Sequence, residues 1–209
     1  MNIKDLVKLT QKKYRREMGM CIIEGEKLVR EHCDRAVAVF TREQLGKDFN
    51  RVTDLETPQG ILAVVPIPKP TAVTFPYIVL DTIQDPGNVG TILRTACAFG
   101  YKTVFCINCA DTWSQKVIRS AMGAQFELNI IEGFESIPKG SELYIADMSG
   151  TEIKKPTGKF GIAFGSEGQG ISNKIKSMPH KIISIPMKNG TESLNVAVAS
   201  GIIMHVWAQ

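Results

Sequence analysis

The chain has 209 residues, 44% of them hydrophobic and 22% charged, and this ordinary globular composition excludes a coiled coil, a disordered protein and a disulfide-dense miniprotein. No segment approaches the run of about 18 apolar residues that a membrane span needs, and the first residues lack the apolar core of a signal peptide. Because the five cysteines follow no framework spacing, we expect a cytoplasmic protein with free thiols.

Basic side chains crowd the N-terminus. The whole chain has a net charge of +4, and residues 1–16 alone carry six basic residues against the single acid Asp5. As one helix, this segment would place Lys8, Lys12 and Arg16 on one face, where they repel one another mildly and favour a polyanion such as nucleic acid. A solvated basic face without a partner explains the same pattern. The candidate RNA-binding residues are Lys8, Lys12, Lys13, Arg15 and Arg16.

Residues 1–66 alternate short apolar runs with polar helical stretches. The runs are CIIEG, AVAVF and ILAVV, beginning at residues 21, 36 and 61. This periodicity predicts a small α/β domain. Prolines then gather at positions 66, 68, 70 and 76, where each restricts the backbone, so residues 67–76 are predicted to be a linker.

Residues 77–209 contain five short apolar runs bounded by glycine, proline, asparagine or aspartate. They are YIVLD, TVFCI, LYIAD, GIAFG and KIISIP, beginning at residues 77, 103, 143, 161 and 181. Runs that are apolar at nearly every position suit strands covered on both faces. The segment is therefore predicted to be an α/β domain with a parallel sheet and helices between the strands.

The first candidate site follows the strand at 77–81. A turn-rich loop with Gly87 and Gly90 leads into a helix predicted from about Thr91, and such a loop exposes backbone N–H groups to an anion. The spacing is not that of a dinucleotide fingerprint, so the sequence does not support Asp111 as a ribose ligand. Arg94 lies one turn into the helix, within reach of whatever the loop binds.

A structural role for Arg94 would be an ion pair on its own helix. Residues 87–98 contain no acid, which favours a functional role instead.

The second candidate site is the glycine-rich stretch at 164–170, where a ligand can lie against the main chain. Glu167 within it is either a functional acid or a solvated loop residue. The third is the loop after Pro186, which leads into an apolar helix with Thr191 or Ser193 as the expected N-cap.

These three segments resemble the motifs of the SpoU (TrmH-type) branch of the SPOUT methyltransferases. The matching patterns are D-x-x-x-D-P-x-N-x-G-x-x-x-R-T-A at 81–96, F-G-S-E-G-x-G at 164–170 and I-P-M-x-x-x-x-x-S-L-N-V-x-V-A at 185–199. Residues 1–66 resemble the RNA-binding domain of ribosomal-protein type that precedes the catalytic domain in this family. The resemblance implies a catalytic domain over 77–209 with a deep trefoil knot, a feature that periodicity does not predict.

The resemblance also implies transfer of a methyl group from S-adenosylmethionine to a ribose 2′-hydroxyl of RNA. By motif position, the cofactor-binding residues are Gly165, Ile185 and Leu194, and the catalytic residues are Arg94, Asn88, Glu167, Ser193 and Asn195. The family's proposed base is the residue at Arg94. A guanidinium with a pKa above about 12 is better suited to stabilising the developing oxyanion and holding an RNA phosphate.

The remaining roles are hypotheses of the same kind. Glu167 is expected to orient Arg94, Asn88 and Asn195 to hold the ribose or the active-site loops, and Ser193 to support the third loop. The family also implies a homodimer, and the apolar C-terminal helix over 196–207 suits burial at such an interface as well as in a core.

Large-subunit (23S) ribosomal RNA is the favoured substrate, by analogy with relatives that have this N-terminal domain. The alternatives are a transfer RNA 2′-O-methyltransferase and a non-catalytic RNA-binding descendant of the family. An oxidoreductase would need an intact dinucleotide fingerprint, and base methylation is disfavoured by the SpoU-type motifs. No metal is expected, because the pair Cys106 and Cys109 has no second pair and suits a packed strand end.

Overall fold

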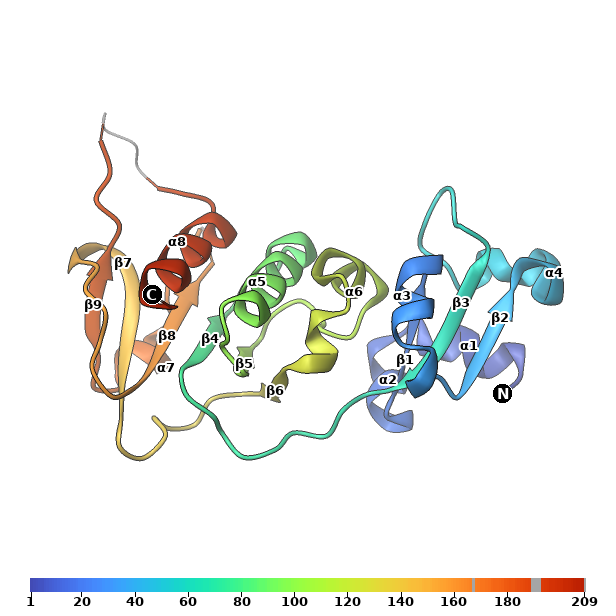
Figure 1. The fold of residues 1–209 in the computed structure, drawn as a ribbon, viewed down its shortest axis with the longest axis horizontal. Helices are drawn as coiled ribbons and strands as arrows, with labels where there is room; N and C mark the ends of the chain where they lie inside the picture. The colour runs from blue at the N-terminus through green and yellow to red at the C-terminus, as the bar shows by residue number, and fades with distance from the viewer. Residues whose placement is uncertain (167, 189–192, 209) are drawn as a thin grey trace.

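The computed structural model describes residues 1–166, 168–188 and 193–208, and it shows two α/β units (Figure 1). The N-terminal unit has a three-stranded antiparallel sheet in the order β1-β3-β2. Its elements, with η marking a 3-10 helix, are α1 (Ile3–Leu9), α2 (Lys12–Met18), β1 (Met20–Glu24), α3 (Glu26–Glu31), η1 (Cys33–Arg35), β2 (Ala38–Thr41), α4 (Arg42–Leu45), η2 (Gly46–Arg51) and β3 (Ile61–Pro66). The three apolar runs of the sequence form the three strands.

The small sheet is buried on both faces. Ile22 of β1 and Leu62 of β3 pack against Leu6 of α1 in a core that belongs to the N-terminal unit. Cys21 and Ile23, which alternate with Ile22, point to the opposite face and join the core of the C-terminal unit. The two-residue period of a strand thus divides its side chains between two cores.

The C-terminal unit is built on a six-stranded parallel sheet in the order β6-β5-β4-β8-β7-β9. Its elements are β4 (Tyr77–Asp81), α5 (Pro86–Ala98), β5 (Thr103–Ile107), α6 (Gln115–Ala121), η3 (Ala124–Glu127), β6 (Asn129–Glu132), β7 (Ser141–Glu152), β8 (Lys159–Gly165), α7 (Asn173–Lys176), β9 (Lys181–Ser184) and α8 (Val196–Ala208). Every residue of β4 and β5 is buried. The predicted α/β class and parallel sheet are confirmed.

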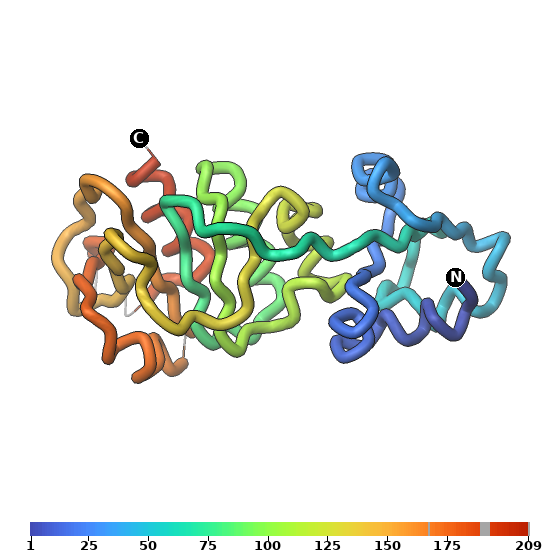
Figure 2. The backbone as a smooth tube through the Cα atoms, turned by 90° about the horizontal axis from the view of Figure 1, so that it is seen from below, coloured from blue at the N-terminus to red at the C-terminus, as the bar shows by residue number. Residues whose placement is uncertain are grey.

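Residues 67–76 connect the two units without helix or strand, and Figure 2 shows them running in an extended path toward β4. The segment is held against the C-terminal unit. The Thr71 N–H donates to Asn129 Oδ1 at 2.8 Å, and the Asn129 side chain donates back to the Thr71 carbonyl at 3.1 Å. The Thr74 N–H donates to Thr103 Oγ1 at 2.9 Å. The connection therefore lies along the starts of β5 and β6.

The two units also contact each other directly. Arg15 of α2 is only 6% exposed, and its guanidinium pairs with Asp111, which follows β5. The Gln115 side chain donates to the Val52 carbonyl at 2.7 Å, and Arg35 donates to the Phe126 carbonyl at 3.0 Å. Together with the shared apolar core, these contacts dock the N-terminal unit onto α6 and η3.

The basic N-terminal segment is two helices, so the prediction of one face with Lys8, Lys12 and Arg16 is wrong. Helix α1 ends at Leu9, where the Leu9 carbonyl accepts a hydrogen bond from Arg15 Nη1 at 2.7 Å instead of one from a continuing helix. Lys8 therefore lies on α1, whereas Lys12 and Arg16 lie on α2. A tertiary contact has overridden the helical periodicity.

Two further elements differ from expectation. Helix α5 begins at Pro86 rather than near Thr91, because the Asp85 side chain caps it by accepting from the Asn88 N–H at 2.8 Å and proline suits the first helical position. Strand β6 was not predicted, since its four residues are too few to show a pattern. The expected trefoil knot stays a prediction, because the chain path through 189–192 lies outside the described residues.

Candidate active site

The candidate site lies where the order of the parallel sheet reverses. From the neighbouring strands β4 and β8, the order runs outward to β5 and β6 on one side and to β7 and β9 on the other. In open parallel sheets, ligands bind in the crevice beyond the carboxyl ends of the strands at such a point. Two cavities adjoin each other here, one largely apolar and one polar.

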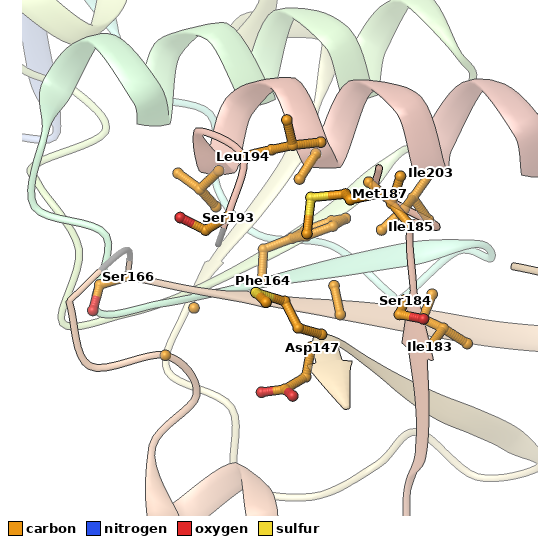
Figure 3. A pocket seen from close by; sticks show the side chains of 16 residues that line it. Asp147, Phe164, Ser166, Ile183, Ser184, Ile185, Met187, Ser193, Leu194 and Ile203 are labelled. Atoms are coloured by element: carbon orange, nitrogen blue, oxygen red, sulfur yellow. The ribbon is translucent and has the colours of Figure 1, made fainter. Parts of the chain in front are cut away.

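The apolar cavity has a volume of about 190 Å³ and lies between the chain segments after β8 and β9, the middle of β7 and α8 (Figure 3). The three expected cofactor-binding residues, Gly165, Ile185 and Leu194, all line it. Phe164 and Ile203 contribute to its apolar wall. The fold therefore brings together, in one cavity, three residues that lie in two motifs far apart in sequence.

Gly165 has no room for a side chain. A Cβ atom there would lie 2.3 Å from the carbonyl carbon and oxygen of Gly170 and 2.6 Å from the Ile171 nitrogen. The loop closes on itself at this point, since the Gly170 N–H donates to the Ser166 carbonyl at 2.8 Å. The main chain of the loop is thereby brought against the cavity, and the expected contact of a ligand with that main chain stays a prediction.

The polar cavity has a volume of about 410 Å³ and adjoins the first. Ser166 and Val196 line both cavities. The other lining residues of the polar cavity are Thr82, Ile83, Gln84, Asp85, Asn88, Gly168 and Gln169. A ligand in the apolar cavity and a second ligand in the polar cavity would therefore lie next to each other, close to Ser166 and Val196.

Asn88 lines this second cavity and is joined there to Asn195, although the two residues are 107 positions apart in the sequence. The Asn195 side-chain amide donates to Asn88 Oδ1 at 3.0 Å, joining the first turn of α5 to the start of α8. Asn195 Oδ1 accepts from the backbone N–H groups of Ala197 at 2.9 Å and Val198 at 3.3 Å. Asn195 is therefore an N-cap of α8, a role expected of Thr191 or Ser193.

The other expected catalytic residues are less closely grouped. Arg94 is exposed on α5, lines neither of the two cavities, and makes no hydrogen bond or ion pair with any residue that the structure describes. Ser193 is exposed at the margin of the apolar cavity. Glu167 and Thr191 lie outside the described residues. The role of Arg94 therefore stays a prediction.

Asp81 is a buried acid close to the candidate site, and the sequence assigned it no role. It ends β4, is fully buried, and accepts a hydrogen bond from the Ser172 N–H at 2.7 Å. This bond ties the first motif to the end of the loop that carries the second. The available signal was the first aspartate of the 81–96 motif, but no spacing rule connects it to residue 172.

The candidate RNA-binding residues separate into two groups. Lys8, Lys12, Lys13 and Arg16 are exposed. Arg15 is buried and engaged by Asp111, so it is removed from the set. Lys12 and Arg16 line a further cavity of about 280 Å³ with the segments that follow β5 and β6. That cavity lies at the same edge of the sheet as the candidate active site.

The cysteine pair lies at the end of β5, with Cys106 in the strand and Cys109 just after it. Burial raises the pKa of the Cys109 thiol to about 11 and that of Cys106 well above its usual value, so neither thiol is a reactive thiolate at neutral pH. The described ranges contain no cluster of three or more metal-ligating side chains. Asp111, which the sequence analysis rejected as a ribose ligand, belongs to the contact between the units.

No helix in the described ranges has the length and apolar character needed to span a membrane.

Comparisons with known proteins agree with this architecture. A model of the SpoU rRNA Methylase family matches residues 76–205, and a model of the MRM3-like substrate binding domain matches residues 1–46. A Bacillus subtilis protein named 23S rRNA (guanosine(2553)-2′-O)-methyltransferase RlmP is 31% identical, with 97% of this chain and 94% of that one aligned.

Solved structures show the same fold over nearly the whole chain. A TrmH-family protein from Porphyromonas gingivalis superposes with a TM-score of 0.83 at 30% identity, covering 98% of this chain and 96% of that one. An AdoMet-bound rRNA methyltransferase from Sinorhizobium meliloti has a TM-score of 0.80 at 24% identity, covering 97% and 92%, and so shares the fold. With the family model spanning both cavities, the chain belongs to the SpoU rRNA methylase family, a family of RNA methyltransferases, as its three motifs predicted.

Proposed function

We propose that the protein transfers the methyl group of S-adenosylmethionine to a ribose 2′-hydroxyl of large-subunit ribosomal RNA. The observation that carries this proposal is the pair of adjoining cavities, one suited to a nucleoside and the other polar and next to Asn88 and Asn195. Ribosomal RNA is favoured over transfer RNA because the relative from Bacillus subtilis, aligned over 97% of the chain, is named for 23S rRNA. This substrate also accords with the cytoplasmic location expected from the sequence.

The apolar cavity fits the proposed cofactor. Gly165 brings main chain rather than a side chain to its wall, which lets a flat base lie close to the loop. Ile185 and Leu194 would cover the base with apolar surface. When bound, S-adenosylmethionine supplies an electrophilic methyl group on a positively charged sulfur. Ser166 and Val196, shared by both cavities, would lie next to that group.

The polar cavity would hold the ribose that is methylated. Asn88 and Asn195, locked together by their hydrogen bond, would present fixed amide groups to the sugar and align its 2′-oxygen for in-line attack. Arg94 lies on the same helix as Asn88 but outside the cavity lining, so its side chain would extend to this oxygen when RNA is bound. There it would stabilise the negative charge that develops as the hydroxyl proton leaves to solvent, and it would hold an adjacent phosphate. Glu167 would orient Arg94, and Ser193 would support the third loop.

The N-terminal unit would hold the RNA away from the reacting ribose. Residues 1–66 would form this domain, 67–76 the connection and 77–209 the catalytic domain. Lys8, Lys12, Lys13 and Arg16 remain as candidates for phosphate contact. Lys12 and Arg16 lie at the same sheet edge as the polar cavity, so an RNA strand would follow that edge.

We also propose a homodimer that forms through the C-terminal helix. Val198, Ile202 and Val206 of α8 are 51%, 37% and 39% exposed, and their four-residue spacing makes them one apolar stripe. Such a stripe is poorly suited to water and would be covered by a second copy of the chain. Sedimentation equilibrium at micromolar concentration tests this part of the proposal.

The function is tested with labelled S-adenosylmethionine and unmodified RNA. We expect label in large-subunit ribosomal RNA, recovered in an alkali-resistant dinucleotide because a methylated 2′-oxygen cannot attack the neighbouring phosphate. Label only in transfer RNA would establish the alternative substrate class. Cofactor binding without transfer to ribosomal RNA, transfer RNA or assembled subunits would identify a binding-only member of the family and overturn the proposed activity.

Gly165→Ala is expected to weaken cofactor binding more than tenfold and to lower the free energy of unfolding by about 1–3 kcal/mol, because the added methyl meets backbone atoms that have no space to yield. Isothermal titration calorimetry and urea denaturation measure the two effects. The matched control is Gly168→Ala in the same loop, where a Cβ would meet nothing within 4 Å. Equal cofactor affinities for the two variants would contradict the assigned role of Gly165.

Substitutions of Asn195 separate its two roles. Asn195→Asp keeps the oxygen that caps α8 but loses the amide that donates to Asn88, so we expect transfer to fall about tenfold while the melting temperature stays within about 2 °C. Asn195→Ala loses both and is expected to cost about 1 kcal/mol of stability as well. Thermal unfolding and single-turnover methyl transfer measure these effects. Full activity of Asn195→Asp would show that the contact with Asn88 is not used.

A further inference from the structure

Strand β7 departs from regular pairing beside the apolar cavity. Ala146 and Thr151 of β7 both pair with Ile183 of β9, so residues 147–150 bulge out of the ladder. The chain passes very close to β9 here, since a Cβ on Gly150 would lie 2.6 Å from the Ile183 backbone. Bulges next to active sites commonly redirect a side chain. In this molecule, the redirected residue is Asp147.

Asp147 is the one titratable residue among the described residues that line the apolar cavity. Its Oδ1 accepts hydrogen bonds from both the N–H of Ser149 at 2.9 Å and the hydroxyl of Ser149 at 2.7 Å. These bonds lower the pKa of the Asp147 carboxyl, so the group is ionised at neutral pH. No described residue donates to Oδ2, which leaves one charged oxygen of an oriented carboxylate available to a ligand.

The position of Asp147 selects one part of the proposed cofactor. Figure 3 shows its carboxylate at the margin of the cavity, on the side opposite Leu194 and beyond the apolar wall near Phe164. If the base fills the apolar region and the methyl group faces Ser166, the ribose lies between them, next to this margin. Carboxylates in nucleotide-binding proteins accept hydrogen bonds from ribose hydroxyls.

We propose that Asp147 is a specificity-determining residue that accepts hydrogen bonds from the ribose hydroxyls of S-adenosylmethionine. The assignment rests on the proposed function, because it needs the apolar cavity to hold this cofactor. It goes beyond the three residues that the motifs assign to the cofactor. This role would account for the bulge at 147–150, since regular pairing with β9 would keep residue 147 in the ladder and away from a bound ribose.

The test measures binding of two nucleosides by calorimetry to the full chain. S-adenosylhomocysteine contains adenosine and the amino-acid group, whereas 5′-methylthioadenosine contains the adenosine part, with its ribose, but no amino-acid group. For Asp147→Asn, which keeps an acceptor for Ser149, we expect the Kd of both to rise about tenfold or more. The matched control is Glu152→Gln, which removes an exposed acid from the same strand outside the cavity lining and is expected to leave both Kd values within twofold.

A third ligand sharpens the assignment. The 2′,3′-dideoxy form of methylthioadenosine has no hydroxyls to donate, so the wild type and Asp147→Asn should bind it equally. A loss for S-adenosylhomocysteine but not for methylthioadenosine would overturn the proposal in favour of the ligand's ammonium group. Unchanged affinity for both would overturn it entirely. Failure of the wild type to bind either nucleoside would instead overturn the proposed function, and this assignment with it.

Discussion

Arg94→Ala is expected to lower the rate of methyl transfer by about a hundredfold to a thousandfold, the usual effect of removing one group that stabilises a developing oxyanion. Cofactor affinity should stay within twofold, because Arg94 does not line the apolar cavity. The fold should also be unaffected, since the side chain is exposed and has no hydrogen bond or ion pair to the described residues. Single-turnover transfer at saturating cofactor and RNA isolates the chemical step from binding.

Arg94→Lys is the matched variant. It keeps the positive charge but loses the planar fork that contacts two oxygens at once. We expect activity between that of the wild type and Arg94→Ala, with most of the loss in kcat. Near-normal activity of Arg94→Lys would show that charge alone suffices. Near-normal activity of Arg94→Ala would remove this residue from the catalytic site.

Arg15→Ala is expected to lower the free energy of unfolding by about 3–5 kcal/mol, because the change leaves Asp111 and the Leu9 carbonyl without their buried donor. Side-chain exposure is 7% for Arg15 and 14% for Asp111, so water compensates little for the lost partner. Urea denaturation followed by circular dichroism gives the free energy. The loss should fall on both units together, since Arg15 joins α2 to the segment after β5.

Arg16→Ala is the control for this prediction. The Arg16 side chain also pairs across the units, with Glu132, but the two side chains are 55% and 48% exposed. Exposed pairs contribute about 0–1 kcal/mol, so this variant should be nearly as stable as the wild type. Similar losses for Arg15→Ala and Arg16→Ala would contradict the structural distinction between them. Arg16→Ala should weaken RNA binding, and Arg15→Ala should do so only through unfolding.

Much of the C-terminal unit could be predicted from the sequence because its strands are locally encoded. The apolar runs at 77–81 and 103–107 match β4 and β5 residue for residue. A strand buried on both faces has to be apolar throughout, so its signal does not depend on the rest of the chain. Gly165, Ile185 and Leu194 could be named as cofactor-binding candidates for a similar reason, since they stand at recognisable positions within motifs.

Elements set by distant contacts could not be predicted. The break after Leu9 depends on the Arg15 side chain folding back and pairing with Asp111, 96 positions away. The start of α5 was missed for a different reason. Asp85 is a local capping signal, but Gly87 and Gly90 after it made the first turn of the helix resemble a loop. Gly90 lies inside α5, where a Cβ atom would lie 2.3 Å from Ser120 Cβ on α6. Close packing of the two helices therefore requires glycine here, whereas the sequence suggested an anion-binding loop.

The family, the parallel α/β unit and the residue types available for chemistry follow from the amino-acid sequence, because they depend on local patterns and short motifs. Three features depend on how the chain packs: Arg15 belongs to the contact between the units, Asn195 caps α8 while bonding Asn88, and a bulge places Asp147 at the apolar cavity. Hydrogen bonds and close approaches between distant segments form only once the chain has packed. No local pattern contains them.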